Sequence, residues 1–252
     1  MDLRQFTLPT GVGLSHLNVY TEDAPAALAS GPGGSAHFHT VCSELYYVLS
    51  GSGSVELISG KGYQKVALEP RQLVCMTPGI IHRLDNPNKN LEILVIMQNG
   101  GLAERGDYIL TFPDKILADD AAYASAVKIS SHADAITRRN LSLEGFNSLK
   151  STIQTDQNAG RAALDKLYQH ARRILAPKIE GFEWVLRTGS LTEVKASHDA
   201  VDFIRNNHME YLDKARWCSI DPAQDQIRSG LCGDLRSYAV SGKFTEEGIQ
   251  VA

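Results

Sequence analysis

The pattern of hydrophobic and polar positions divides this chain of 252 residues near its middle. In the first part, short runs rich in β-branched and aromatic residues alternate with Gly, Pro, Asn and Asp, which is typical of strands joined by turns. Many short strands separated by turns favour a sandwich or a barrel. The expected strands are 44–49, 54–58, 64–68, 72–77 and 91–98, with a turn at Gly51-Ser52-Gly53 between the first two.

After Gly100 and Gly101, hydrophobic residues recur at helical intervals. This spacing predicts that His208 is packed in a core, and Trp184, as a single aromatic residue, is also expected in a core. The alternating segment 182–194 predicts a hairpin, and the residues from Cys218 onward predict a loop. The expected helices are 119–128, a short helix opened by a capping box at 131–134, 157–175 and 197–214.

Composition and charge narrow the function classes. Hydrophobic residues make up 43% of the chain and charged residues 21%, as in ordinary soluble globular proteins. The net charge of −4 gives no electrostatic argument for nucleic acid, and the pair Arg138-Arg139 is expected on a solvated helix face. There is no run of the roughly eighteen hydrophobic residues that cross a bilayer, and the N-terminal residues lack the order of a signal peptide. Four cysteines without close pairing predict reduced thiols and a cytoplasmic location.

Three histidines and one glutamate form the most specific pattern in the chain. His37 and His39 are separated by one residue, so in an extended strand they point the same way, roughly 7 Å apart. Glu44 opens the next predicted strand, and His82 follows a turn much later. Imidazole and carboxylate ligands together suit Fe, Mn, Ni, Cu or Zn better than Mg or Ca. The alternative is that these are unrelated surface residues.

These residues resemble the two sequence motifs of the cupin superfamily, over residues 14–98. In the second motif Thr77 stands where proline is usual, and Arg71 stands where glycine is expected. The resemblance implies a cupin-type (double-stranded β-helix) barrel, so the fold class is mainly β with a mainly helical C-terminal extension. We expect the barrel at 1–100 and the extension, packed on it, at 101–252. The matching positions are Gly31, His37, His39, Glu44 and Gly51, then Pro78, Gly79, His82 and Asn86, and the implied metal ligands are His37, His39, Glu44 and His82.

Strand parity predicts which side chains share the barrel interior with these ligands. Tyr46 and Val48 lie on the same face as Glu44, Leu84 shares a face with His82, and Met76 precedes the turn. We take Tyr46 as the candidate catalytic residue, because a phenol beside a metal can donate a hydrogen bond or a proton. A tyrosine that only packs is the alternative. The expected substrate pocket is Tyr46, Val48, Met76 and Leu84.

The resemblance does not specify a reaction, and three hypotheses follow. We favour an Fe(II) enzyme that uses O2, a dioxygenase or oxidase of a small organic molecule, because an open metal position and a largely hydrophobic pocket suit it. The second is a non-redox metal-dependent isomerase, epimerase or lyase, which needs acid and base groups that the strands supply sparingly. The third is a non-enzymatic binding or storage protein, against which the complete ligand set argues.

The cofactor that the two enzyme hypotheses share is one divalent transition metal, with Fe(II) first and Mn, Ni, Cu or Zn as alternatives. The expected partner is a small-molecule substrate. Neither nucleic acid nor a membrane is expected, and a homodimer is left open.

Overall fold

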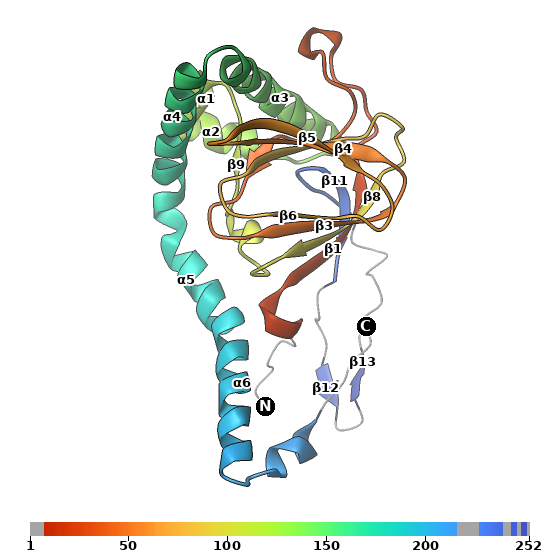
Figure 1. Cartoon of the computed structure of the whole chain (residues 1–252), viewed down its shortest axis with the longest axis vertical. Coiled ribbons are helices and arrows are strands. Elements are labelled where there is room, and N and C mark those ends of the chain that lie inside the picture. Colours follow the sequence, from red (N-terminus) through yellow and green to blue (C-terminus); the bar gives the residue numbers. More distant parts are fainter. Residues whose placement is uncertain (1–7, 216–226, 239–242, 246–247, 251–252) are drawn as a thin grey trace.

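The computed structural model describes residues 8–215, 227–238, 243–245 and 248–250. The strands form two antiparallel sheets that face each other as a barrel (Figure 1). The first sheet runs in the order β10 (Arg228–Ser229), β11 (Gly233–Ser237), β1 (Gly13–Val19), β8 (Glu92–Met97), β3 (Glu44–Ser50) and β6 (Leu73–Met76). The second runs in the order β5 (Gly62–Leu68), β4 (Gly53–Ser59), β7 (Ile81–Asp85), β2 (His37–Phe38) and β9 (Ile109–Leu110).

A hydrophobic core fills the space between the two sheets, because alternate residues of each strand point inward. On β3, Glu44, Tyr46 and Val48 are buried while the residues between them are less so. The turn from β3 to β4 requires a glycine, since Gly51 has a φ of +73° and an added Cβ would lie 1.9 Å from the Asn90 carbonyl oxygen. The predicted strands of the first half are therefore confirmed, and so is the barrel. The core residues are Leu17, Val19, Tyr46, Val48, Val55, Leu68, Met76, Leu84, Leu91, Ile93 and Cys232.

Strands from beyond residue 100 complete both sheets. β9 pairs with β2, and β11 pairs with β1 over five residues, from Ser15 opposite Ser237 to Val19 opposite Gly233. A short pair, β12 (Lys243–Thr245) and β13 (Gly248–Gln250), follows. The prediction of a loop after Cys218 is therefore wrong for these residues, while Cys218 itself lies outside the described residues. Strands this short carry little sequence pattern, and β11 is stabilised by its pairing with β1.

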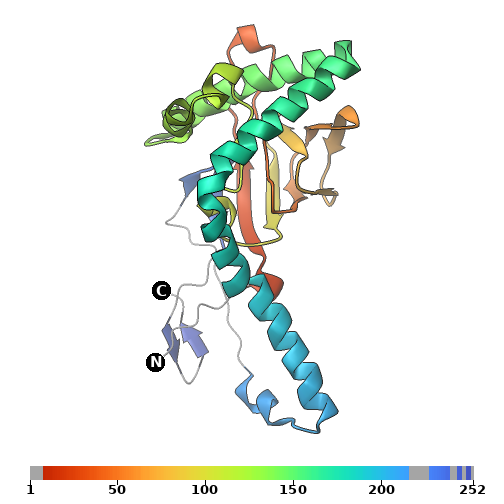
Figure 2. The same ribbon diagram turned by 90° about the vertical axis from the view of Figure 1, so that its left-hand side faces the viewer.

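Helices cover the outer face of the second sheet and then extend beyond the barrel (Figures 1 and 2). Phe146, Leu164 and Leu167 pack in one cluster with Phe38 and Ile58 of the sheet. The mainly helical character predicted for this region is confirmed. The helices are α1 (Asp114–Leu117), α2 (Asp120–Val127), α3 (His132–Thr155), α4 (Gln157–Leu175), α5 (Ile179–Thr188) and α6 (Ser190–Arg205), with short 3-10 turns η1 (Pro9–Gly11), η2 (Ala26–Leu28), η3 (Ala103–Arg105), η4 (Ala176–Lys178) and η5 (Glu210–Lys214).

Some predictions for the helical region are wrong. The segment 182–194 is not a hairpin, because Phe182 and Val185, one helical turn apart, pack against the core from α5. The expected helix 197–214 is α6, which ends at Arg205, so His208 lies after the helix and is exposed. Trp184 is half exposed rather than packed in the core.

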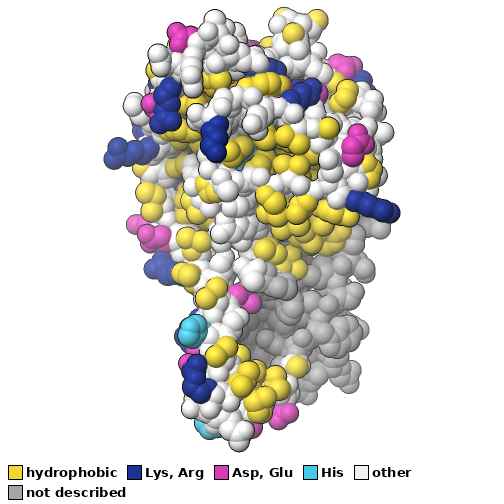
Figure 3. Space-filling model, viewed as in Figure 1, with side chains coloured by type: hydrophobic (Ala, Val, Ile, Leu, Met, Phe, Trp, Pro, Cys, Tyr) yellow, Lys and Arg dark blue, Asp and Glu magenta, His cyan; other side chains and the backbone are white. Residues whose placement is uncertain are grey.

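Hydrophobic side chains of α6 are also exposed, and Figure 3 shows hydrophobic side chains on the lower part of the molecule. No helix among the described residues is long and hydrophobic enough to cross a membrane.

The thiols Cys42, Cys75 and Cys232 are free. Burial raises the pKa of the Cys42 thiol to about 12, although its hydrogen bond to the Asn99 carbonyl acts in the opposite direction. This thiol is therefore unreactive.

Candidate metal centre

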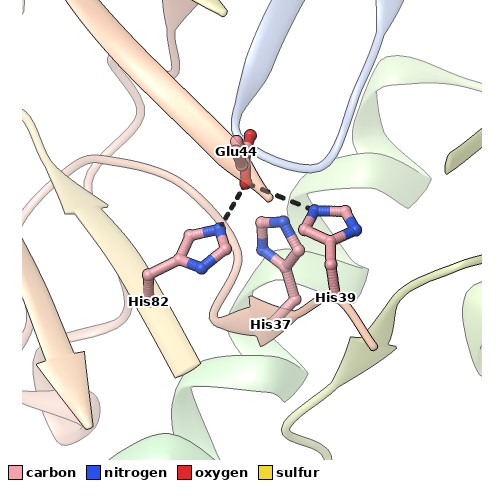
Figure 4. A group of neighbouring side chains, drawn as sticks. All are labelled: His37, His39, Glu44 and His82. Carbon is pink, nitrogen blue, oxygen red and sulfur yellow. Dashed lines mark ion pairs between the residues drawn. The ribbon is translucent and has the colours of Figure 1, made fainter. Parts of the chain in front are cut away.

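The two motifs meet because the strands that carry them are neighbours. His37 on β2 lies directly opposite His82 on β7 in the antiparallel register. His39 follows β2, and Glu44 is the first residue of β3 in the other sheet. The four side chains point toward one another (Figure 4). All four are buried, and their ligand atoms lie within 4.8 Å of one another, which is the arrangement predicted from the sequence.

Backbone carbonyls orient all three imidazole rings. Nδ1 of His37 donates to the Ser35 carbonyl at 3.0 Å, and Nδ1 of His82 donates to the Ile80 carbonyl at 3.1 Å. Nδ1 of His39 donates to the carbonyl of Asp107. A ring nitrogen that donates in this way fixes the tautomer and leaves Nε2 as the free acceptor.

The acceptors that remain face one another, so the cluster fits a cation. Oε2 of Glu44 lies 3.0 Å from Nε2 of His82 and 3.3 Å from Nε2 of His39. Among the described residues, neither Oε2 of Glu44 nor Nε2 of His82 has a hydrogen-bond donor. Buried acceptors without donors are costly. One divalent ion between them would satisfy the whole set, and three imidazoles with one carboxylate suit a transition metal.

The electrostatics of the cluster also suit a metal. Burial alone would raise the pKa of Glu44, but His82 and His39 outweigh it and hold that pKa well below its usual range. Burial and the neighbouring imidazoles of His82 and His39 lower the pKa of His37 well below its usual range. Burial opposes protonation of His39, yet the Glu44 carboxylate raises its pKa. Glu44 is therefore anionic and His37 neutral, as metal ligands must be.

Asp107 supports the centre from outside both motifs. Its carboxylate accepts hydrogen bonds from the hydroxyl of Thr40 at 2.6 Å and from the backbone N–H of Cys42 at 2.8 Å. It thereby holds the turn between His39 and Glu44, while its own carbonyl orients His39. Asp107 is fully buried, and no signal in the sequence links it to the motifs.

A cavity of about 340 Å³ opens beside the cluster. His37, His39, Glu44 and Tyr46 contribute to its wall. The residues of the C-terminal part of the wall come from β10, β11 and the loop between them. The remaining lining residues are hydrophobic (Leu17, Val95, Met97, Ala103, Leu231, Leu235) and polar or small (Ser15, Glu104, Tyr108, Arg138, Arg228, Ser229, Gly230, Cys232).

The residues expected to form the substrate pocket do not all reach this cavity. Tyr46 lines it, whereas Val48, Met76 and Leu84 belong to the hydrophobic core between the sheets and are not part of the wall. Strand parity predicts the face on which a side chain lies but not how far along the barrel the cavity extends. Burial, Glu44 and Cys232 raise the pKa of Tyr46 well above its usual range, so its phenol is neutral. Its hydroxyl has no hydrogen-bond partner among the described residues.

Sequence reasoning missed the polar residues of the cavity wall that lie outside the two motifs and β3. Arg138 and Arg139, expected on a solvated face of α3, are both buried, and Arg138 lines the cavity. Tyr108 and Cys232 come from segments without a motif. Helical spacing places Arg138 near hydrophobic positions of α3, but only the docking of α3 on the barrel brings it to the cavity.

Comparison with known proteins assigns the family of the barrel. Residues 26–97 match the cupin domain family, so this part of the chain is a cupin domain. No curated protein matches the chain. The segment matched includes all four residues of the cluster.

The solved structures that resemble this chain have low sequence identity and low TM-scores. TDP-fucose-3,4-ketoisomerase (WlaRA) from Campylobacter jejuni is 18% identical over 38% of this chain and 64% of that chain, with a TM-score of 0.31. The DMSP lyase DddQ from Ruegeria pomeroyi is 24% identical over 34% of this chain and 40% of that chain, with a TM-score of 0.28. A mutant of the oxalate decarboxylase OxdC from Bacillus subtilis is 19% identical over 39% of this chain and 26% of that chain, with a TM-score of 0.31. In each case the chain spans less than two thirds of the solved protein.

Proposed function

We propose that this chain is a mononuclear metal-dependent enzyme that acts on a small organic molecule in the barrel cavity. The observation that carries the proposal is that His37, His39 and Glu44 belong both to the ligand cluster and to the wall of the cavity. A structural metal site is closed by its protein ligands, whereas a catalytic site has a position open to substrate. The donor set suits Fe(II), and also Mn, Ni, Cu or Zn.

The residues around the cluster have distinct roles in this proposal. The bound metal would supply a positive centre that polarises an oxygen of the substrate. Glu44 balances part of that charge, and the backbone bonds of the three histidines keep the ligands in place. Tyr46 holds a proton on its neutral phenol at the cavity wall, from which it can donate a hydrogen bond or the proton itself. Leu17, Val95 and Met97 exclude water from the same space.

The cavity supports a non-redox reaction, that of an isomerase, epimerase or lyase, as the leading class. The sequence favoured O2-dependent oxidation because an open metal position and a largely hydrophobic pocket suit it, and because the strands supply few acid or base groups for the non-redox class. Besides the expected Tyr46, the wall carries Tyr108 and Arg138, so the cavity holds more polar groups than the strands alone supply. The hydrophobic side of the cavity still suits an Fe(II) dioxygenase or oxidase, which we retain as the second candidate. A binding or storage role is the third outcome of the test below.

The first experiment tests the metal centre. His39→Ala removes one ligand and leaves Glu44 without one of its neighbours, so elemental analysis should show loss of most of the bound metal. His198→Ala on the exposed face of α6 is the matched control and should retain the metal of the unchanged protein. Full metal content in the His39→Ala variant would exclude this ligand set.

The second experiment separates the reaction classes. Turnover of candidate substrates is measured in air and in the strict absence of O2, with the protein loaded with Fe(II), Mn or Zn in turn. Activity that persists without O2, with more than one metal competent, supports the non-redox class. Activity that requires both Fe(II) and O2 supports the dioxygenase instead, and metal binding without any turnover supports a binding protein.

A further inference from the structure

Arg138 is a buried cation without a buried anion. The residue is 6% exposed, and no carboxylate among the described residues forms an ion pair with it. Two of its N–H groups donate to backbone carbonyls, one to Gly230 at 2.5 Å and one to Val127 at 3.4 Å. Its Nε has no partner in the part of the chain that the structure describes. An arginine has five donors, so donors remain for a ligand.

Two other arginines of the described structure, Arg83 and Arg139, are also buried with an Nε that has no partner, but neither lines the cavity. Arg83 is paired with Glu56 at 2.7 Å, so its charge is compensated within the protein. Arg139 donates to the backbone carbonyls of Glu22, Gly33 and Asp23 and does not line the cavity. Arg139 thus connects segments of the chain, whereas Arg138 reaches the cavity wall. Burial of an uncompensated charge is expensive unless a partner of opposite charge is present.

The position of Arg138 relates it to the metal centre through the C-terminal part of the wall. Its bond to Gly230 holds the loop between β10 and β11, and the hydroxyl of Tyr20 donates to the same carbonyl at 2.9 Å. Cys232 in that loop lies with its sulfur 4.0 Å from Nδ1 of His37. Arg138 and three residues of the cluster line the same cavity, so a single molecule in it can lie between them.

We propose that Arg138 is the anion-binding residue of this cavity and that its ligand is a small carboxylate with a hydrocarbon part. The inference rests on the proposed function, because it takes the cavity beside the cluster as the substrate site. The planar guanidinium group matches the geometry of a carboxylate and binds it through parallel N–H donors. The hydrocarbon part lies against Leu17, Leu231 and Leu235 on the cavity wall.

The test compares carboxylates with neutral molecules of the same shape. Hexanoate and hexanamide, and the corresponding pairs from propanoate to octanoate, are titrated into the full chain by calorimetry. Titrations use protein stripped of metal with a chelator and protein reloaded with metal. The metal-free protein is expected to bind the carboxylate more tightly than the amide, because Arg138 does not depend on the metal. No preference for any carboxylate over its amide would overturn the inference.

Variants assign the preference to Arg138. Arg138→Gln should weaken hexanoate binding about ten- to a hundredfold, the affinity equivalent of a charged hydrogen bond, with little effect on hexanamide. Arg138→Lys keeps the charge and should retain part of the preference. Arg161→Gln removes an exposed arginine that pairs with Asp165, and should bind like the unchanged protein.

The outcomes separate this inference from the proposed function. Hexanoate binding that is unchanged in Arg138→Gln contradicts the role of Arg138, whatever the metal content. An unchanged protein that selects carboxylates through Arg138 but never binds a metal contradicts the proposed enzyme and not the anion site. If Arg138→Gln fails to fold, the Arg138→Lys variant and the comparison of carboxylates with amides still decide the question.

Discussion

At the residue scale, the role of the Tyr46 hydroxyl beside the cluster can be measured with a single substitution. It is buried without a hydrogen-bond partner in the described structure, beside Glu44 on the same strand. Tyr46→Phe removes only this oxygen, so metal content should stay unchanged while turnover falls about 10²-fold, a typical effect of a lost proton donor. Tyr47→Phe, at the next position of β3 and on its other face, is the control. Equal turnover in both variants would reduce Tyr46 to a packing residue.

Asp107 lies one step further out than the four clustered residues, and its carboxylate should act through the turn between His39 and Glu44. Asp107→Asn weakens the hydrogen bonds that hold Thr40 and Cys42, and so loosens the turn between His39 and Glu44. Loss of an outer partner of a metal ligand typically lowers metal affinity about 10- to 100-fold. Competition with a chelator measures the affinity. Unfolding in urea, measured on the metal-free protein, shows whether the change is confined to the metal. Unaltered affinity would mean that the Asp107 carboxylate does not support the centre.

Short-range spacing explains why the cluster of three histidines and one glutamate could be predicted from the sequence and its surroundings could not. His37, His39 and Glu44 lie within one turn and two strand ends, where alternation decides which way a side chain points. His82 joins them by strand pairing, which the second motif marks. Asp107 and Arg138 reach the site only through the tertiary packing of a loop and of α3, and local sequence carries no signal for such contacts.

At the element scale, a buried charge cluster joins α3 to the second sheet. Glu56 on β4 accepts from Arg83 on β7 at 2.7 Å, from Lys150 on α3 at 2.6 Å and from the hydroxyl of Tyr63 on β5 at 2.7 Å. Burial alone would raise the pKa of Glu56, but Lys150 and Arg83 lower it from its ordinary 4.5 to about 2. The carboxylate therefore stabilises the fold fully above pH 4.5, and this contribution is lost as the pH falls toward 2.

Glu56→Gln should destabilise the protein and change its response to acid. Removal of one partner from a buried ion pair costs about 3–5 kcal/mol of unfolding free energy. Urea unfolding at neutral pH and at a series of pH values below 4.5 measures both effects. The variant should show a smaller loss of stability in that range than the unchanged protein. Glu69→Gln, an exposed position, is the control. Parallel pH curves for the Glu56 variant and the unchanged protein would contradict the assignment.

The helices show which elements local sequence can predict. Helix α4 was predicted with its bounds, because its stripe of hydrophobic residues is long and Asp156 caps its first turn. The segment around Gly189 was not, since its alternation fits a strand and its helical state depends on the packing of Phe182 and Val185 on the barrel. Tertiary contacts override a local pattern where that pattern is short.

At the scale of the whole molecule, the proposed division near residue 100 can be tested against the contacts that cross it. β9 and β11 pair with β2 and β1, and Asp107 holds the turn between His39 and Glu44, so parts of both sheets and of the candidate centre come from beyond that point. The backbone N–H of Gly100 donates to the carbonyl of Gly11 at 2.7 Å, which holds the junction against the barrel.

A fragment of residues 1–100 should therefore not form a stable, metal-loaded barrel. It would leave β1 without β11 and β2 without β9, and unpaired strand edges of this kind promote aggregation. A longer fragment, residues 8–238, includes both strands and α3, and it should retain the metal. Expression of the two fragments, followed by elemental analysis and limited proteolysis of the full chain with mass spectrometry, compares them directly. If the shorter fragment is stable and binds metal, or if proteases cut the full chain first at Gly100 and Gly101, the cupin domain folds alone and the helical region is a separate module.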